Sequence, residues 1–153
     1  MKASTDECAQ AILEIAPAIM RTIRTEMRSH RTADLSVPQF RALAFIDNHQ
    51  GPSLSDVAGH IGLTLPSMSK IVDGLVARKL ITREIAASDR RRMTLALTSR
   101  GQILLKAAHE ATKDCLAEML QSLSPVERTL VINAMETLRP IFLVQPATPA
   151  QQS

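Results

Sequence analysis

The stretch LSDVAGHIGLTLPSMSKIVD, residues 54–73, decides the fold expected of this 153-residue chain. It predicts two short helices joined by a tight turn, because Ala58 is small enough for helices to meet closely and Gly62 tolerates a positive φ. Apolar residues stand where the shared core needs them, at Val57, Ile61, Leu63, Met68 and Ile71. The pattern is that of a helix-turn-helix, although a plain pair of helices in an all-helical core would share it.

The second helix of this pair is expected to begin after Thr64, which can cap it, with Pro66 in its first turn. Its apolar positions point into the core, which leaves the remaining ones facing outward: Pro66, Ser67, Lys70, Asp73 and Gly74. Hydroxyl groups and an ammonium near a helix N-terminus suit contacts with phosphates and with base edges in a major groove.

After Leu80 the apolar period changes to two over residues 81–85 and 93–97, which predicts a β-hairpin. Residues 78–100 hold seven basic and two acidic residues, a net charge of +5 against +3 for the whole chain. Three arginines, Arg90, Arg91 and Arg92, stand at the expected tip. A basic hairpin beside a helix-turn-helix makes a wing that can reach a minor groove, where arginine is favoured. The alternative is a solvated charged hairpin.

Asp89 stands out among the arginines of this tip. It can pair with the guanidinium of Arg91 and fix its direction, or it can simply initiate the turn.

Helix start signals mark the rest of the chain. Capping boxes begin at Ser4 and Ser36, and Ser53 with Asp56 opens a short helix. Thr98 can cap a long helix, and Ser124 followed by Pro125 and Glu127 opens the last one. Pro17 interrupts the first apolar run, so we expect a kink or break there. The tail, residues 145–153, is polar and rich in proline and is expected to be disordered.

Composition excludes several classes. There is no apolar run of about 18 residues and no apolar leader, so neither a membrane span nor a secretory signal is expected. Two cysteines make no disulfide framework, which favours a cytoplasmic protein. Tyr and Trp are absent, so stacking on single-stranded nucleic acid has little support. No catalytic constellation, phosphate loop or metal cluster is evident, so we expect neither an enzyme nor a cofactor.

These motifs resemble the MarR-type (multiple antibiotic resistance regulator) transcription factors. The matching segments are PQFRAL at 38–43, LSDVA at 54–58, SMSKIVDGL at 67–75, the wing residues Asp89, Arg90 and Arg91, and LTSRG at 97–101. The resemblance implies a mostly α fold with a small β-hairpin wing, and a homodimer that reads a palindromic operator in double-stranded DNA. It also implies that Ser67, Ser69 and Lys70 face the major groove, and that Arg91, held by Asp89, enters the minor groove.

Residues and resemblance together define the expected organisation. Residues 1–35 form an N-terminal dimerisation helix, 36–98 the winged domain, and 99–144 the C-terminal dimerisation helices. The apolar residues that favour a dimer are Leu104, Leu105, Leu116, Leu120, Leu123, Val131, Leu138 and Phe142. The expected DNA-binding residues are Thr64, Pro66, Ser67, Ser69, Lys70, Asp73, Ser88, Asp89, Arg90, Arg91 and Arg92.

The sequence says less about the signal to which the protein responds. The resemblance implies a repressor released by a small aromatic or anionic effector, and Met20, Met27, His30 and Arg24 stand near such a place in helix order, although core packing also explains the methionines. Cys8 lies near a helix N-terminus, where a thiol can become reactive, but the tyrosines that accompany such a cysteine in redox-sensing relatives are missing. The alternatives are therefore a redox-sensing regulator and a winged helix used only for protein–protein contact.

Overall fold

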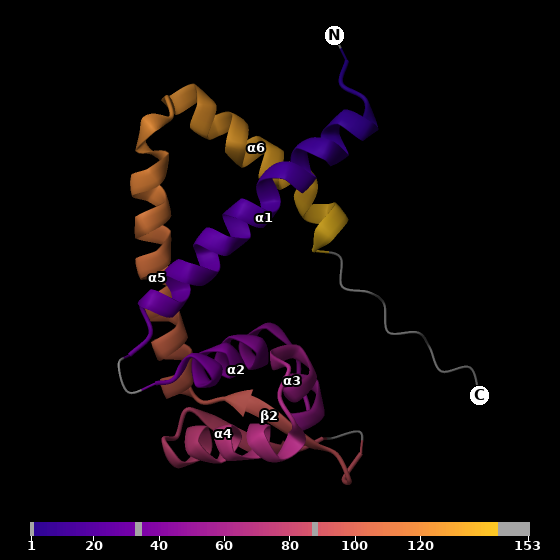
Figure 1. The fold of residues 1–153 in the computed structure, drawn as a ribbon, viewed down its shortest axis with the longest axis vertical. Helices are drawn as coiled ribbons and strands as arrows, with labels where there is room; N and C mark the ends of the chain where they lie inside the picture. The colour runs from indigo at the N-terminus through magenta and orange to yellow at the C-terminus, as the bar shows by residue number, and fades with distance from the viewer. Residues whose placement is uncertain (1, 33–34, 87–88, 144–153) are drawn as a thin grey trace, which may run out of the picture. The chain divides into compact units, whose positions relative to one another are not determined.

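The computed structural model describes residues 2–32, 35–86 and 89–143 (Figure 1). The chain divides into two compact units, Met1–Asp114 and Cys115–Ser153. The first contains α1 (Thr5–Ser29), α2 (Val37–Asn48), α3 (Leu54–Ile61), α4 (Leu65–Ala77), β1 (Ile81–Ile85), β2 (Met93–Leu97) and most of α5 (Ser99–Met119). The second contains the end of α5, a 3-10 turn η1 (Leu120–Ser122) and α6 (Pro125–Phe142). The proposed tail, 145–153, lies outside the described residues.

The predicted fold class is confirmed: the chain is mostly helical, with one antiparallel hairpin. Each predicted helix start coincides with an observed cap. Complete capping boxes form at Ser4, Ser36, Ser53 and Ser124, in which the serine hydroxyl accepts the N3 amide and the N3 side chain accepts the serine amide. Local hydrogen bonding therefore determines where these helices begin.

Of the two outcomes predicted at Pro17, a kink or a break of the helix, the break is wrong. Helix α1 runs without interruption from Thr5 to Ser29, with Pro17 inside it. A proline removes one backbone donor, and the other hydrogen bonds of a helix of 25 residues are enough to carry it through. Among the described residues, no helix combines the length and apolarity that a bilayer crossing requires.

The core of the first unit lies between α2, α3, α4, the hairpin and the first half of α5. Its buried side chains include Leu43, Val57, Met68, Leu75 and Leu80, each with at most 1% of its surface exposed. Leu105, expected at a dimer surface, is instead buried in this core, and Leu104 packs against it. The dimer assignment of Leu105 is therefore wrong, because α5 turns Leu105 and Ala108 toward the core of the first unit, whereas that of half-buried Leu104 stays a prediction.

The hairpin joins α5 through a junction at Lys79 and Leu80. The Thr98 hydroxyl donates to the Lys79 carbonyl at 2.6 Å, and the Thr98 amide donates to the Leu80 carbonyl at 3.0 Å. The same hydroxyl accepts the amide of Gly101 at 3.1 Å, which caps α5 as predicted. A Cβ at Gly101 would overlap the Leu80 carbonyl oxygen, so only glycine allows this approach. The Leu-Thr-x-x-Gly motif therefore acts as a structural junction.

This junction makes Gly101→Ala a sensitive substitution. The added methyl group meets backbone rather than a movable side chain, so we expect a loss of about 1–3 kcal/mol in the free energy of unfolding. Gly59 is the matched control, because a Cβ there meets nothing within 4 Å. Gly59→Ala should stabilise the protein by about 0.5–1 kcal/mol through helix propensity. Urea unfolding followed by circular dichroism measures the free energy of unfolding of both variants. Equal changes in the two variants would contradict the close backbone approach at Gly101.

Candidate nucleic-acid interface

The turn between α3 and α4 has the predicted geometry. Gly62 adopts a left-handed conformation with φ 81°, and its amide donates to the Ala58 carbonyl at 2.9 Å. The amide of Leu63 donates to the same carbonyl at 3.0 Å. Val57 and Met68 are fully buried beneath the turn, whereas Leu63 is half-buried. Helix α3 and helix α4 are thus packed as a helix-turn-helix unit.

Most of the predicted contact residues on α4 lie on its exposed side. Pro66, Ser67 and Lys70 are exposed, and Ser69 is half-buried. Thr64 is the N-cap: its hydroxyl accepts the Ser67 amide at 3.3 Å and donates to the Ser67 hydroxyl at 3.0 Å. Thr64 therefore orients Ser67 at the N-terminus of α4, where amide groups and the helix dipole favour an anion.

Gly74 does not face outward as the sequence analysis expected. It is half-buried, and a Cβ there would come within 3.3 Å of the Gln39 side-chain nitrogen on α2. The absence of a side chain lets α2 lie close to α4 at this point, so Gly74 has a packing role.

Asp73 lies on the exposed side of α4 but is not alone there. Its carboxylate pairs with the guanidinium of Arg83 on β1. The pair neutralises the acidic side chain that the sequence predicts on the contact face of α4, and it joins α4 to the hairpin. Sequence reasoning missed Arg83, because the ten-residue separation of Arg83 and Asp73 carries no helical or strand periodicity.

The wing is an antiparallel pair in which Ile81 lies opposite Leu97 and Ile85 opposite Met93. Beyond the strands, the Ala86 amide donates to the Arg92 carbonyl at 2.9 Å. The wing residues Asp89, Arg90, Arg91 and Arg92 are exposed. Ser88, a predicted contact, lies outside the described residues.

Asp89 acts on the backbone of the wing turn. Its carboxylate accepts the amide of Arg91 at 2.9 Å, and its carbonyl accepts the amide of Arg92 at 3.1 Å. Within the described part of the chain, the Arg91 guanidinium makes no ion pair with Asp89, contrary to the expected pairing. Asp89 therefore shapes the turn, and the guanidinium groups of Arg90 and Arg91 have no acidic partner among the described residues.

Arg92 differs from its two neighbours. Its guanidinium lies 3.6 Å from the carboxylate of Asp56, in the first turn of α3. That carboxylate also accepts the Ser53 amide at 2.9 Å. The Ser53 amide is the main reason why the pKa of Asp56 is lowered, and Arg92 lowers it further. The structure thus brings Arg92 to the helix-turn-helix rather than to the open end of the wing.

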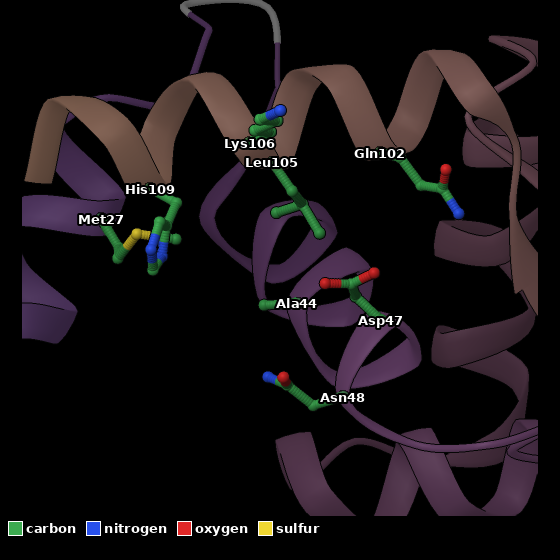
Figure 2. A pocket seen from close by; sticks show the side chains of 8 residues that line it. All are labelled: Met27, Ala44, Asp47, Asn48, Gln102, Leu105, Lys106 and His109. Carbon is green, nitrogen blue, oxygen red and sulfur yellow. The ribbon is translucent and has the colours of Figure 1, made fainter. Parts of the chain in front are cut away.

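Two adjoining cavities open in the first unit beside α2. The smaller, of about 280 Å³, is lined by α1, α2 and α5 (Figure 2). Met27, Ala44, Leu105 and His109 lie around it, together with polar side chains of α2 and α5. The larger, of about 720 Å³, shares Met27, Ala44, Asn48 and His109 with the smaller cavity.

The larger cavity is rich in cationic and aromatic groups. It is lined by Ile23, Arg24, Met27, Arg28, Phe40, Arg41, Ala44, Phe45, Asn48, His49, His60 and His109. Arg24 and Met27 were expected at a sensing site, and both line it, whereas Met20 and His30 are not among its lining residues. The four-residue spacing of Arg24 and Arg28, and of Arg41, Phe45 and His49, could have indicated these one-sided faces.

Known proteins are similar to this chain in sequence and in fold. A MarR family model matches residues 33–92. An uncharacterized helix-turn-helix transcriptional regulator, YfiV of Bacillus subtilis, is 28% identical over 105 residues, 69% of this chain and 66% of that protein. The chain is therefore similar to winged-helix regulators of the MarR type, and the family match lies within residues 33–92.

Solved structures agree on the fold. The Thermotoga maritima transcriptional regulator Tm0710 aligns with a TM-score of 0.73 at 19% identity, covering 89% of this chain and 99% of that one. A variant of S. aureus MepR, solved with an oligodeoxyribonucleotide, aligns with a TM-score of 0.56 at 23% identity, covering 87% and 96%. MepR has also been solved with ethidium bromide bound. Lys70 and the wing arginines lie within the residues that the MarR family model matches.

The pairing of Asp56 with Arg92 can be tested in solution. Because the Ser53 amide is the main cause of the lowered pKa, Arg92→Gln should raise the pKa of Asp56 while leaving it below its ordinary value of about 3.9. A lowered pKa means that ionised Asp56 stabilises the fold above about pH 4, and that this stabilisation is lost as the pH falls through the lowered pKa. Carboxyl NMR titration of both proteins checks this, and an unchanged pKa would show that no pair forms.

Proposed function

We propose that this regulator is a homodimer that binds a palindromic operator in double-stranded DNA and acts as a repressor released by a small anionic effector. One observation carries DNA binding: the exposed N-terminal half of α4 lies in the same domain as a wing whose Arg90 and Arg91 have no acidic partner among the described residues. The chain carries out no chemistry in this proposal; its activity is binding.

In the proposed complex α4 enters the major groove. Ser67 and Lys70 lie on its exposed side, and Ser69 is half-buried beside them. Hydroxyl groups and the N-terminal amides contact phosphates and base edges, whereas Lys70 supplies a mobile cation. Asp73 contributes no net charge, because Arg83 neutralises it.

The wing is proposed to lie along the minor groove. Asp89 holds the turn through the Arg91 amide, so the Arg91 guanidinium projects from an ordered backbone. Arginine is favoured in a narrow minor groove because the negative potential there is strong. The oligodeoxyribonucleotide found on MepR supports DNA as the partner.

Dimer formation is supported by apolar faces that the chain does not cover. In the first unit, α1 exposes Leu13 (69%) and Ile15 (57%). In the second unit, no residue of α6 is buried, and its exposed apolar side chains include Leu130, Ile132, Met135, Ile141 and Phe142. Patches of this kind mark interfaces, and a second copy of the chain is the proposed cover.

The larger cavity is the proposed effector site. Three arginines and three histidines line it and, among the described residues, no carboxylate does, which favours an anion. The stacked rings of Phe45, His49 and His60 lie in its wall and offer an aromatic surface for a planar group.

Selection of operator DNA tests the function directly. The purified chain is mixed with random duplex DNA, and the retained fragments are sequenced. Two half-sites related by a two-fold axis and centred about 34–36 Å apart, one DNA turn, are expected from a dimer with paired reading helices. Failure to enrich any motif, with binding that does not weaken as salt rises, would favour protein–protein contact instead.

Lys70→Ala and Arg91→Ala should each weaken operator binding by about 1–3 kcal/mol without unfolding the protein, because each removes a cation from the proposed interface. Lys113→Ala is the control of equal charge change, since Lys113 pairs with Glu110 on α5. Gel-shift titrations at several salt concentrations measure the affinities. If the Lys113 variant loses as much affinity as the other two, the effect reflects net charge rather than the assigned contacts.

A further inference from the structure

The larger cavity and the wing share one segment of chain, residues 45–60. On the cavity side, Phe45 stacks on His49 with ring centroids 3.9 Å apart, and on His60 with centroids 4.5 Å apart. His49 also bonds through Nδ1 to the Phe45 carbonyl at 2.8 Å. Phe45 belongs to α2, His49 is the residue that caps its C-terminus, and His60 belongs to α3, so the stack connects the end of one helix to the next.

The other side of the segment supports β2. The Leu95 amide donates to the carbonyl of Pro52, which is buried, at 2.9 Å. Gly51, with φ 55°, lies against Thr94: a Cβ on Gly51 would be 3.5 Å from its methyl group. Arg92, just before β2, pairs with Asp56. Figure 1 shows β2 running beside α2 and α3, with which it packs.

The connection between the two sides is short and constrained. Four residues separate α2 from the Ser53 cap of α3, and Pro52 is one of them. Ser53 and Asp56 exchange two hydrogen bonds, of 2.9 and 3.1 Å, that hold the first turn of α3. The connection therefore lacks the length and freedom of a flexible loop that could absorb a displacement at Phe45.

We propose that residues 45–60 couple the cavity to the wing within one subunit, and that Asp56 and Arg92 are positioning residues for the wing. The proposal rests on the regulatory function above and deepens it. It needs no second subunit, so it differs from a mechanism in which an effector changes the distance between the two DNA-reading helices of a dimer. Arg92 acts through Asp56 rather than through a phosphate.

Amide hydrogen exchange tests the coupling without DNA or effector. Phe45→Leu removes both ring stacks while leaving an apolar side chain. The Leu95 amide should then exchange about five- to tenfold faster, because its Pro52 acceptor is held less firmly. The Thr98 amide, bonded to Leu80 in the same strand region, is the internal reference that reports general destabilisation. Arg24→Gln, on the α1 side of the cavity, is the matched control and should change neither amide.

A faster exchange of the Leu95 amide, with the exchange rate of the Thr98 amide unchanged, supports the coupling. Equal acceleration of Leu95 and Thr98, or no change at either, overturns it. This outcome is independent of the proposed function: a chain that selects no operator refutes the regulator, whereas the exchange result concerns the segment alone.

A double-mutant cycle tests the positioning role. Asp56→Asn keeps an oxygen for the Ser53 amide but removes the charge, and Arg92→Gln removes the partner. On the selected operator, each single variant and the double variant should lose affinity by the same factor, about three- to tenfold, with an unchanged salt slope. Arg92→Lys should restore most of the affinity. Additive losses, with a salt slope lower by about one in the Arg92→Gln protein, would overturn the positioning role and make Arg92 a phosphate contact.

Discussion

The close approach of backbone to backbone at Leu80 and Gly101 is the constraint on which the winged domain depends. Four elements meet there: α4 ends, β1 begins, β2 ends and α5 begins. One threonine, Thr98, satisfies the carbonyls of Lys79 and Leu80 and caps α5 at the same time. Because buried backbone groups must be paired, this junction fixes the base of the wing and the direction in which α5 leaves it.

The arginines of the hairpin divide into two kinds. Arg83 and Arg92 face carboxylates, Asp73 on α4 and Asp56 on α3, and so connect the hairpin to the helix-turn-helix. Arg90 and Arg91 have no acidic partner in the part of the chain that the structure describes. Exposed ion pairs contribute little to stability, so the value of the paired arginines lies in geometry. A charge count cannot separate the two kinds, because it gives every arginine the same weight.

The helices that pack against the wing also line the larger cavity. Helix α2 supplies core residues such as Leu43 on one side, and Arg41 and Phe45 to the cavity on another, where its C-cap His49 joins them. The next residues, through Pro52, reach β2. The region that lines the cavity is therefore also part of the wing's support, and the sequence did not reveal this because the contacts join residues some 40 positions apart.

Local chemistry determined much of this protein from sequence alone. The caps at Ser4, Ser36, Ser53 and Ser124, the turn at Gly62 and the two strands follow from hydrogen bonds and backbone preferences within a few residues. Only the tertiary structure decided the rest: Leu105 is in the core, α1 continues through Pro17, Gly74 faces Gln39, and Arg92 pairs with Asp56. These outcomes depend on contacts between residues that are far apart in the sequence. Periodicity along the chain predicts which side of a helix or strand is apolar, but it does not predict which other element packs against that side.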